Sequence, residues 1–313
     1  MTRFAFLSSD IEFILVHFHL EFQERFRLST AEILRLRRDI LIAARNFLGY
    51  RSSERFQTLF DPPLPVDPVA LRKFQRPGPP FAILPDPGMA GVYDVGDRLE
   101  ITATFWGRGG HALADFAHVL QTLGKSGFYR GQGSFELAAI EAEDASGNRT
   151  LVWSEGEDLH LLAPPVNEVD WWLSRGGTPT SVLLEFLTPA RLISQGRPLF
   201  KVNFDRLFPF ILRRVTSMIY AHCGREVIAD LSRLLAAAAQ VCEQENSLCW
   251  QDWRTLEGQD KVQDLGGIIG SVYLEGEALQ TVFDILQVGS LMNIGKGAAF
   301  GGGRFRLSEV QLS

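Results

Sequence analysis

The chain has 313 residues, of which 46% are hydrophobic and 22% are charged. This composition indicates a globular protein that is long enough for two domains. No apolar run approaches the ~18 residues that a membrane span requires. Asp10 and Glu12 interrupt the first apolar run, so we expect neither a membrane helix nor a signal peptide. The formal net charge of −6 argues against a uniformly basic nucleic-acid binder.

The cysteines favour a reducing compartment. Cys223, Cys242 and Cys249 are few, odd in number and not placed at metal-ligand spacing. Such thiols stay free where the surroundings are reducing. We therefore expect a cytoplasmic protein without a zinc site, and no cluster of acids elsewhere in the sequence suggests another metal or a cofactor.

Charge is distributed unevenly along the chain. Arginines crowd one early segment that has few acids: Arg25, Arg27, Arg35, Arg37, Arg38, Arg45, Arg51 and Arg55. Acids crowd a later segment, between residues 136 and 170. This asymmetry permits a local positive surface on a protein whose overall charge is negative.

The first secondary-structure elements are predicted by their periodicity. Residues 11–22 alternate, with Ile14, Val16 and Phe18 on one face and His17 and His19 on the other, which is typical of a strand. A helix follows from a capping pattern at residues 29–32 and ends at a glycine, residue 49. Three arginines can share its solvent-facing side: Arg35, Arg38 and Arg45.

Each half of the chain then follows approximately the order β-α-β-β-α-β. A proline-rich stretch, residues 61–87, reads as an irregular connection. Further strands are expected at 99–105, 134–140, 181–187, 248–253, 268–274 and 304–312, and helices at 112–123, 204–222, 228–241 and 279–286. We therefore predict an α+β fold of two tandem ferredoxin-like, or RRM-like, domains. They would occupy residues 1–145 and 179–313, joined by an acidic, Trp-containing connection at 146–178.

A glycine-rich stretch, residues 295–307, comes before the last expected strand. Its glycines leave backbone N–H groups uncovered, and successive bare amides suit a phosphate. Lys296 adds a point charge and Arg304 a forked donor. The order excludes a Walker loop, in which the lysine comes last and a helix follows. The predicted phosphate-binding residues are Gly295, Lys296, Gly297, Gly301, Gly302, Gly303 and Arg304; the alternative is a flexible tail without a ligand.

The same pattern occurs in the first half. Gly124-Lys125, then Gly131-x-Gly133-x-Phe135-x-Leu137, matches Gly295-Lys296, then Gly301-x-Gly303-x-Phe305-x-Leu307. Both copies lie between an expected helix and the last expected strand of their half. Self-similarity at the same point of the same topology indicates duplication of one unit.

Several blocks resemble one known family. They are Phe56-Gln57-Thr58-Leu59-Phe60, Tyr93-Asp94-Val95-Gly96-Asp97, Leu187-Thr188-Pro189-Ala190-Arg191-Leu192, Trp250-Gln251-Asp252-Trp253-Arg254, Leu265-Gly266-Gly267-Ile268-Ile269-Gly270 and, most specifically, Ile294-Gly295-Lys296-Gly297 with Phe300-Gly301. On these blocks the chain resembles the Cas6 family, the RAMP-class endoribonucleases that process CRISPR precursor RNA. The resemblance covers nearly the whole chain.

The resemblance implies RNA held between two ferredoxin-like domains and metal-independent cleavage of CRISPR repeat RNA to mature crRNA. Its implied partners are that RNA and other Cas effector subunits, with no membrane and no DNA substrate. The chain departs from the family where relatives often have His and this sequence has Asn293, and in the residues after Arg254. Two alternatives therefore stay open: a catalytically inactive RNA-binding subunit, or a structural subunit of the same superfamily.

Metal-free cleavage of this kind uses the 2′-OH of the RNA as nucleophile and would leave a 2′,3′-cyclic phosphate and a 5′-OH. It needs a base, an acid and cationic donors, and histidine is the natural base near neutral pH. His111 follows a glycine run at an expected helix start, and His17 and His19 share a strand face, so these three are the catalytic candidates. Arg191, Arg35 and Arg38 are the remaining candidates for RNA contact.

Overall fold

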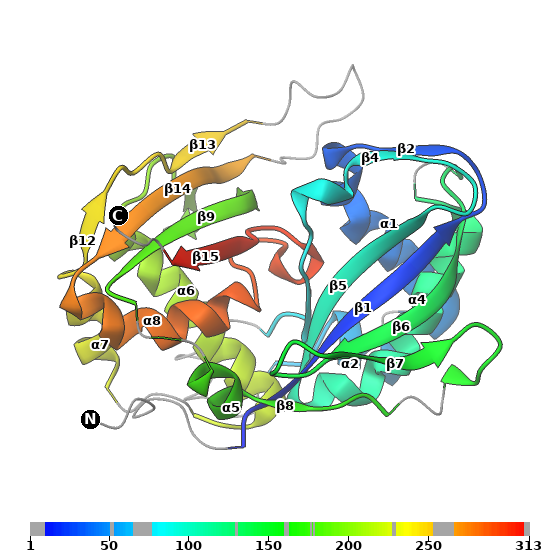
Figure 1. The fold of residues 1–313 in the computed structure, drawn as a ribbon, viewed down its shortest axis with the longest axis horizontal. Coiled ribbons are helices and arrows are strands. Elements are labelled where there is room, and N and C mark those ends of the chain that lie inside the picture. Colours follow the sequence, from blue (N-terminus) through cyan, green and yellow to red (C-terminus); the bar gives the residue numbers. More distant parts are fainter. Residues whose placement is uncertain are drawn as a thin grey trace.

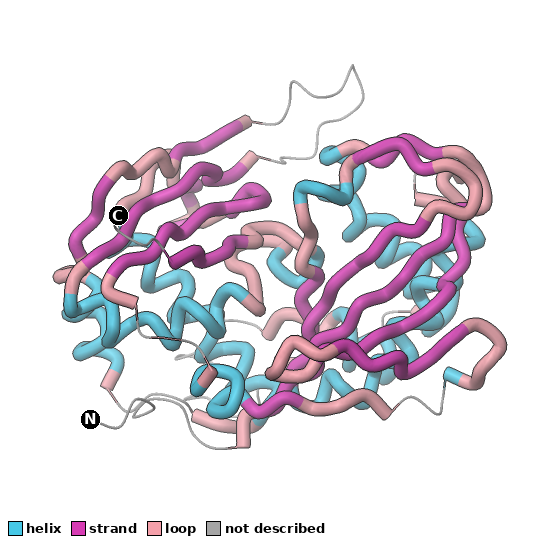
Figure 2. The backbone as a smooth tube through the Cα atoms, in the orientation of Figure 1, coloured by secondary structure: helices cyan, strands magenta, loops and turns pink. Residues whose placement is uncertain are grey.

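The computed structural model describes residues 10–50, 53–64, 77–128, 131–159, 163–175, 177, 179–226, 230–252 and 266–309. The fold is mixed α+β, and every strand pair within it is antiparallel. Its strands form two main sheets, one in each half of the chain (Figure 1). Figure 2 shows the two sheets side by side, with most of the helices on one side of them.

The first sheet has the strand order β3-β5-β1-β6-β7, with β8 beside the start of β1. The strands are β1 (Glu12–Phe22), β3 (Phe81–Ile83), β5 (Arg98–Trp106), β6 (Phe135–Glu143), β7 (Arg149–Ser154) and β8 (Asn167–Glu168). The helices of this half are α1 (Thr30–Leu48), α2 (Glu54–Phe60) and α4 (Leu113–Ser126), and β2 (Phe26–Leu28) pairs with β4 (Gly91–Tyr93).

The second sheet has the order β12-β14-β9-β15, with β13 also pairing with β14. The strands are β9 (Ser181–Ala190), β12 (Cys242–Gln244), β13 (Cys249–Gln251), β14 (Gly267–Glu275) and β15 (Phe305–Glu309). The helices are α5 (Val169–Ser174), α6 (Phe204–Met218), α7 (Leu231–Ala238) and α8 (Glu277–Ser290). A short hairpin, β10 (Ile193–Ser194) with β11 (Arg197–Pro198), follows β9.

The two sheets share one connectivity. Numbered within each half, β1, β3, β5 and β6, and likewise β9, β12, β14 and β15, lie in the order 2-3-1-4. This is the order of a ferredoxin-like β-α-β-β-α-β unit. The two copies of the internal repeat enter β6 and β15, which occupy the same place in their sheets. Because β7 and β8 lie inside the expected connection, the exact domain boundaries stay a prediction.

One expectation about the first half is wrong. The proline-rich stretch 61–87 contains a strand, β3, which forms the edge of the first sheet beside β5. Proline is tolerated next to a strand at a sheet edge, where the missing N–H leaves no ladder bond unmade. Residues 65–76 of the same stretch lie outside the described part of the chain.

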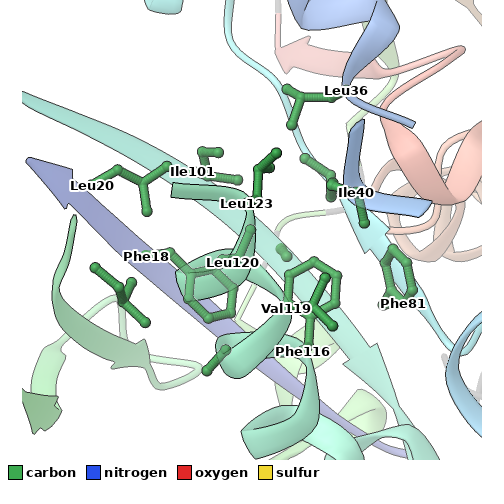
Figure 3. Packing of buried hydrophobic residues seen from close by; sticks show 14 of the residues in the cluster. Phe18, Leu20, Leu36, Ile40, Phe81, Ile101, Phe116, Val119, Leu120 and Leu123 are labelled. Carbon is green, nitrogen blue, oxygen red and sulfur yellow. The ribbon is translucent and has the colours of Figure 1, made fainter. Parts of the chain in front are cut away.

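The alternation in β1 joins the two halves. Val16, Phe18 and Leu20 are fully buried in the core of the first half, where Phe18 packs against Phe116 of α4 (Figure 3). On the other face, Phe13 belongs to the hydrophobic cluster of the second half. Burial of apolar surface contributes ~25 cal/mol per Å2, so this shared cluster holds the halves together.

Helix α1 forms as its sequence predicts. The Ser29 N–H donates to a Glu32 carboxylate oxygen at 2.6 Å, and the Ser29 hydroxyl accepts from the Glu32 N–H at 3.3 Å. This capping box satisfies two N–H groups at the helix start. Ile33, Leu36 and Ile40 face the core, and the arginines of the helix therefore line its outer side.

Candidate nucleic-acid interface

A groove lies between α1 and the glycine-rich turn that follows α8; we call it the main groove. It encloses about 580 Å3 and carries six cationic side chains. Its lining residues are Arg35, Arg37, Arg38, Leu41, Ile42, Arg45, Pro189, Arg191, Gly266, Lys296, Gly297, Phe300 and Gly302. No carboxylate and no histidine occurs among these residues, so the lining itself attracts a polyanion.

The glycine-rich turn, residues 295–303, lies between the two sheets (Figure 1). Gly303 has φ +64°, and a Cβ there would come within 2.0 Å of the Ile294 carbonyl oxygen. Gly295 has φ +84°, and its Cβ would come within 2.7 Å of the Arg191 carbonyl oxygen. Only glycine fits where the backbone is left-handed and another chain segment is this close. These two glycines therefore set the shape of the turn.

The segment after β9 holds this turn in place. The Lys296 N–H donates to the Arg191 carbonyl at 3.0 Å, and the Gly303 N–H donates to the Pro189 carbonyl at 3.0 Å. The Thr188 hydroxyl donates to the Gly301 carbonyl at 2.6 Å and accepts from the Arg304 N–H at 2.8 Å. The Leu-Thr-Pro-x-Arg-Leu block and the glycine-rich block are thus two sides of one clamp.

The first half of the chain contributes a second support. Asn293 is fully buried at φ +55°, and its side-chain amide donates to the Ile83 carbonyl at 2.7 Å and to the Ala298 carbonyl at 2.9 Å. The Thr104 hydroxyl donates to the Leu291 carbonyl at 2.7 Å. Asn293 therefore has a positioning role here and lies inside the protein.

The structure corrects the expectation of bare amides. The N–H groups of Lys296, Ala298, Phe300, Gly301, Gly302 and Gly303 all donate to carbonyl oxygens of the protein. These bonds stabilise the turn itself and leave the amides unavailable to a phosphate. With these six amides engaged, the side chains of Lys296 and the arginines are the main candidates for phosphate recognition in the main groove.

Arg304 does not face the groove. Its guanidinium donates to the Ser290 carbonyl at the end of α8, and burial lowers its pKa to about 10. A cation at a helix C-terminus stabilises the helix. Gly301 and Gly303 are also buried. Of the predicted phosphate-binding set, Lys296, Gly297 and Gly302 line the main groove, and Gly295 lines a neighbouring one.

Arg37 was not among the residues predicted to contact RNA. Its guanidinium lies over the Phe300 ring, 5.6 Å from the ring centroid, between the main groove and a second one of about 390 Å3. We call the second one the side groove; Arg213 and Arg214 also line it. Arg214 donates to the Met292 carbonyl at 3.2 Å, and burial lowers its pKa to about 10. Crowding of arginines was the only sequence signal for Arg37.

Two of the predicted catalytic histidines lie in a polar cluster on the first sheet. His17 is buried, with Nε2 2.8 Å from a Glu143 oxygen and Nδ1 3.1 Å from a Glu100 oxygen. His19 has Nε2 3.0 Å from a Glu141 oxygen. Both therefore engage carboxylates of neighbouring strands. We call this set the histidine-carboxylate cluster: His17, His19, Glu100, Glu141, Glu143 and Arg149.

The third predicted histidine, His111, is exposed and lines a separate pocket of about 390 Å3 with Glu12 and Val166. That pocket shares no lining residue with the main groove. The structure thus brings Arg35, Arg38, Arg191 and Lys296 together in the main groove, and none of the three histidines lines that groove. A catalytic role for a histidine stays a prediction, and these positions do not favour it. Arg254 lies outside the described residues.

Two further properties of the described residues concern membrane spans and metal sites. None of their helices combines the length and the apolar character that crossing a membrane requires. Among the same residues, His, Cys, Asp and Glu side chains form no group of three or more that could hold a metal ion.

Comparisons with known proteins agree with this geometry. A family model described as CRISPR-associated endoribonuclease Cas6 matches residues 184–305, and a model described as an N-terminal domain matches residues 49–166. No curated protein sequence matches the chain.

Among solved structures, a partial Cas6-RT-Cas1–Cas2 complex has a TM-score of 0.59, 14% identity and coverage of 98% of this chain and 48% of that one. The Cas6-RT-Cas1–Cas2 complex has the same TM-score and identity and is covered to 30%. A Cas6 product complex has a TM-score of 0.51 and 16% identity, with 95% of this chain and all of that chain covered.

The chain thus spans about half of the first of these proteins and under a third of the second, whereas it is coextensive with a separate Cas6. At these identities the structural likeness concerns the fold. The match of the Cas6 model to the second half, which supplies the glycine-rich turn and its clamp, adds the sequence evidence. Residues 184–305 thus match the Cas6 family model, and the chain as a whole has the fold seen in Cas6 structures.

Proposed function

We propose that this chain binds CRISPR repeat RNA in the main groove and processes it to mature crRNA. The observation that carries the proposal is the joining of the α1 arginines to the glycine-rich turn in one groove that has six cations and no acid among its described lining residues. A Cas6 product complex is among the solved structures of similar fold. An RNA backbone carries one negative charge per nucleotide, and its neutralisation by Lys and Arg supplies much of the affinity.

The chemistry would run without a metal. The 2′-oxygen attacks the adjacent phosphorus, the bond from phosphorus to the 5′-oxygen breaks, and the products carry a 2′,3′-cyclic phosphate and a 5′-OH. The 2′-OH proton passes to a base and a proton is delivered to the leaving 5′-oxygen. Guanidinium groups of Arg35 and Arg38 and the ammonium of Lys296 would stabilise the charge that builds on the phosphorane, an electrostatic contribution of the oxyanion-hole kind.

A second candidate function is RNA binding without cleavage. The described residues lining the main groove include no imidazole, phenol or carboxylate, the side chains that commonly accept a proton near neutral pH. The RNA would then be held and protected, and cutting would fall to another protein. The six cations of the same groove favour this binding module over a structural subunit that makes no RNA contact.

The partners follow from the same comparisons. Two solved structures of similar fold are Cas6-RT-Cas1–Cas2 complexes. We include other Cas subunits among the partners of this chain, together with the repeat RNA. A purification of the natural assembly, followed by identification of its subunits and its RNA, tests this part.

One experiment separates the two candidate functions. The purified protein is incubated in EDTA with end-labelled repeat RNA, and in parallel with the same RNA carrying a 2′-deoxy nucleotide at the cut. Cleavage in EDTA that the deoxy substitution abolishes supports the metal-independent nuclease. Tight binding without a cut supports the binding module, and absence of binding refutes both.

A further inference from the structure

An exposed aromatic side chain lies beside the cationic grooves. Phe200 is 61% exposed, directly after the β10–β11 hairpin. Its ring centroid lies 5.3 Å from that of Trp250, with 57° between the planes. The Trp250 indole in turn covers Gly266, where a Cβ would come within 2.6 Å of the indole, and Gly266 lines the main groove. The phenyl ring is therefore backed by Trp250 and open on its outer side.

Backbone hydrogen bonds connect this ring to the groove. The Trp250 N–H donates to the Phe200 carbonyl at 2.7 Å, and the Leu199 N–H donates to the Leu192 carbonyl at 3.0 Å. The pairing of Ile193 with Pro198 continues the same register, which places Arg191 beside Phe200. The Lys296 N–H donates to the Arg191 carbonyl at 3.0 Å. Four adjoining chain segments thus carry Trp250, Phe200, Arg191 and Lys296 in a row.

The charges around the ring select its occupant. Arg191 and Lys296 each line both the main groove and the side groove. Lys201 and Arg197, next to the ring along the chain, are exposed. A cationic path that ends at an open aromatic face suits single-stranded nucleic acid, whose phosphates follow the charges while a base stacks on the ring.

We propose that Phe200, supported by Trp250, is a stacking platform for an unpaired base of the RNA at the Arg191 side of the main groove. This inference rests on the proposed function and extends it, because it assigns a single-stranded nucleotide to a defined place. The platform reads no base edge, so it accepts any base and adds affinity without sequence preference.

The test combines one protein change with one RNA change. Phe200→Ala removes the ring, and a set of repeat RNAs removes one base at a time by abasic substitution. We expect Phe200→Ala to weaken binding about fivefold or more and to leave the salt dependence of the affinity unchanged, because no phosphate contact is lost. One abasic position should weaken binding to the wild type by a similar factor and have no further effect on Phe200→Ala.

Phe200→Tyr should retain affinity because it keeps the ring face. Trp171→Ala is the matched control, since Trp171 is also an exposed aromatic residue but belongs to α5, which lines neither groove. Thermal unfolding of each variant checks that the fold is intact. A 2-aminopurine at the sensitive position should be quenched by stacking on the wild type and brighter on Phe200→Ala.

Failures of the two proposals are distinguishable. If the wild type binds no repeat RNA, the proposed function fails and the platform with it. If the wild type binds with a steep salt dependence but Phe200→Ala binds equally well, the platform alone is refuted. Additive losses from Phe200→Ala and every abasic RNA would likewise refute it, because they would show that the ring and the base do not interact.

Discussion

The main groove and the histidine-carboxylate cluster use the same kinds of charge in opposite ways. In the groove, six cations stand together without an acid among the described lining residues. In the cluster, the Arg149 guanidinium lies 2.7 Å from Glu100, and His17 lies between Glu100 and Glu143. In the cluster the cations pair with carboxylates, whereas the described lining of the groove contributes cations and no carboxylate. A net charge of −6 conceals both arrangements.

Histidine and arginine also have different surroundings in these two regions. The sequence suggested histidines as the reactive groups and arginines as helpers. The structure places two of the histidines among carboxylates and gathers the arginines where RNA would lie. Four predictions test this contrast and are given in order of decreasing effect.

The first prediction concerns the α1 arginines. Changing Arg35, Arg38 and Arg45 together to Gln should weaken repeat-RNA binding about a hundredfold or more, because each lost charge-assisted contact is worth ~1.5–3 kcal/mol. The slope of log affinity against log salt should fall by ~0.7 for each single-stranded phosphate contact removed. Fluorescence anisotropy over a salt series measures both quantities.

The matched control neutralises three paired arginines elsewhere. Arg98, Arg149 and Arg225 each form an ion pair, with Glu21, Glu100 and Asp10 respectively. Changing these three to Gln lowers the net charge by the same amount and should leave the salt slope unchanged. Equal losses in both triple variants would mean that overall charge, and not the groove, governs binding.

The second prediction concerns the turn that closes the groove. Gly303→Ala should destabilise the protein by about 3 kcal/mol, because a left-handed φ and a carbonyl 2.0 Å from the new Cβ both oppose the side chain. Gly131→Ala is the matched control in the first copy of the repeat, two residues before the counterpart of Gly303, with φ +83° but nothing within 4 Å of the new Cβ. It should cost only about 1 kcal/mol, and chemical denaturation measures both. Equal losses of stability in the two variants would show that close packing at Gly303 does not hold the turn in place.

Much of the fold was predictable because it is encoded locally. The alternation in β1 and the capping box at Ser29 each lie within a few residues, and both predicted elements formed. The cationic side of α1 was predictable for the same reason: helical spacing alone placed Arg35 and Arg38 away from the core. Their meeting with Lys296 depended on the family resemblance, because no local pattern joins residues so far apart in the chain.

The missed features depend on distant contacts. His17 and Glu143 are 126 positions apart, so nothing near His17 in the sequence reveals its carboxylate partner. Arg304 follows the alternation of a strand, yet its side chain turns back to the end of α8. The short β3 is held by pairing with β5 rather than by its own three residues. In each case tertiary contacts overrode the local pattern.

The third prediction concerns a buried histidine, His222, that lies near two arginines. His222 is buried, donates to the Gly78 carbonyl at 2.9 Å, and lies near Arg214 and Arg108; burial is the main cause that lowers its pKa to about 4. The unfolded chain, with an ordinary pKa near 6.5, binds the proton more readily. The contribution of neutral His222 to the free energy of unfolding is therefore fully present above about pH 6.5. It is lost as the pH falls toward 4, by about 2–3 kcal/mol.

His222→Gln isolates this effect. Glutamine does not titrate and can donate the same hydrogen bond to Gly78, so the variant should lose less stability between pH 7 and pH 4 than the wild type does. Asp39, whose pKa burial raises to about 6, acts in the opposite direction, but it is present in both proteins and cancels in their difference. Chemical denaturation at each pH measures the free energy of unfolding of both proteins. Equal losses between pH 7 and pH 4 in the wild type and the variant would contradict the assignment.

The smallest effect is expected at the histidines that the sequence singled out. Single changes of His111, His17 and His19 to Gln should alter the rate of repeat-RNA cleavage less than about twofold, whereas loss of a true general base costs ~10²–10⁴-fold. His17→Gln should instead lower stability, because His17 is buried between two carboxylates. A large rate loss in one of them, with normal stability and RNA affinity, would show that the RNA bends toward the first sheet. The histidine-carboxylate cluster would then belong to the active site, and the division of the molecule into a paired face and an open groove would fail.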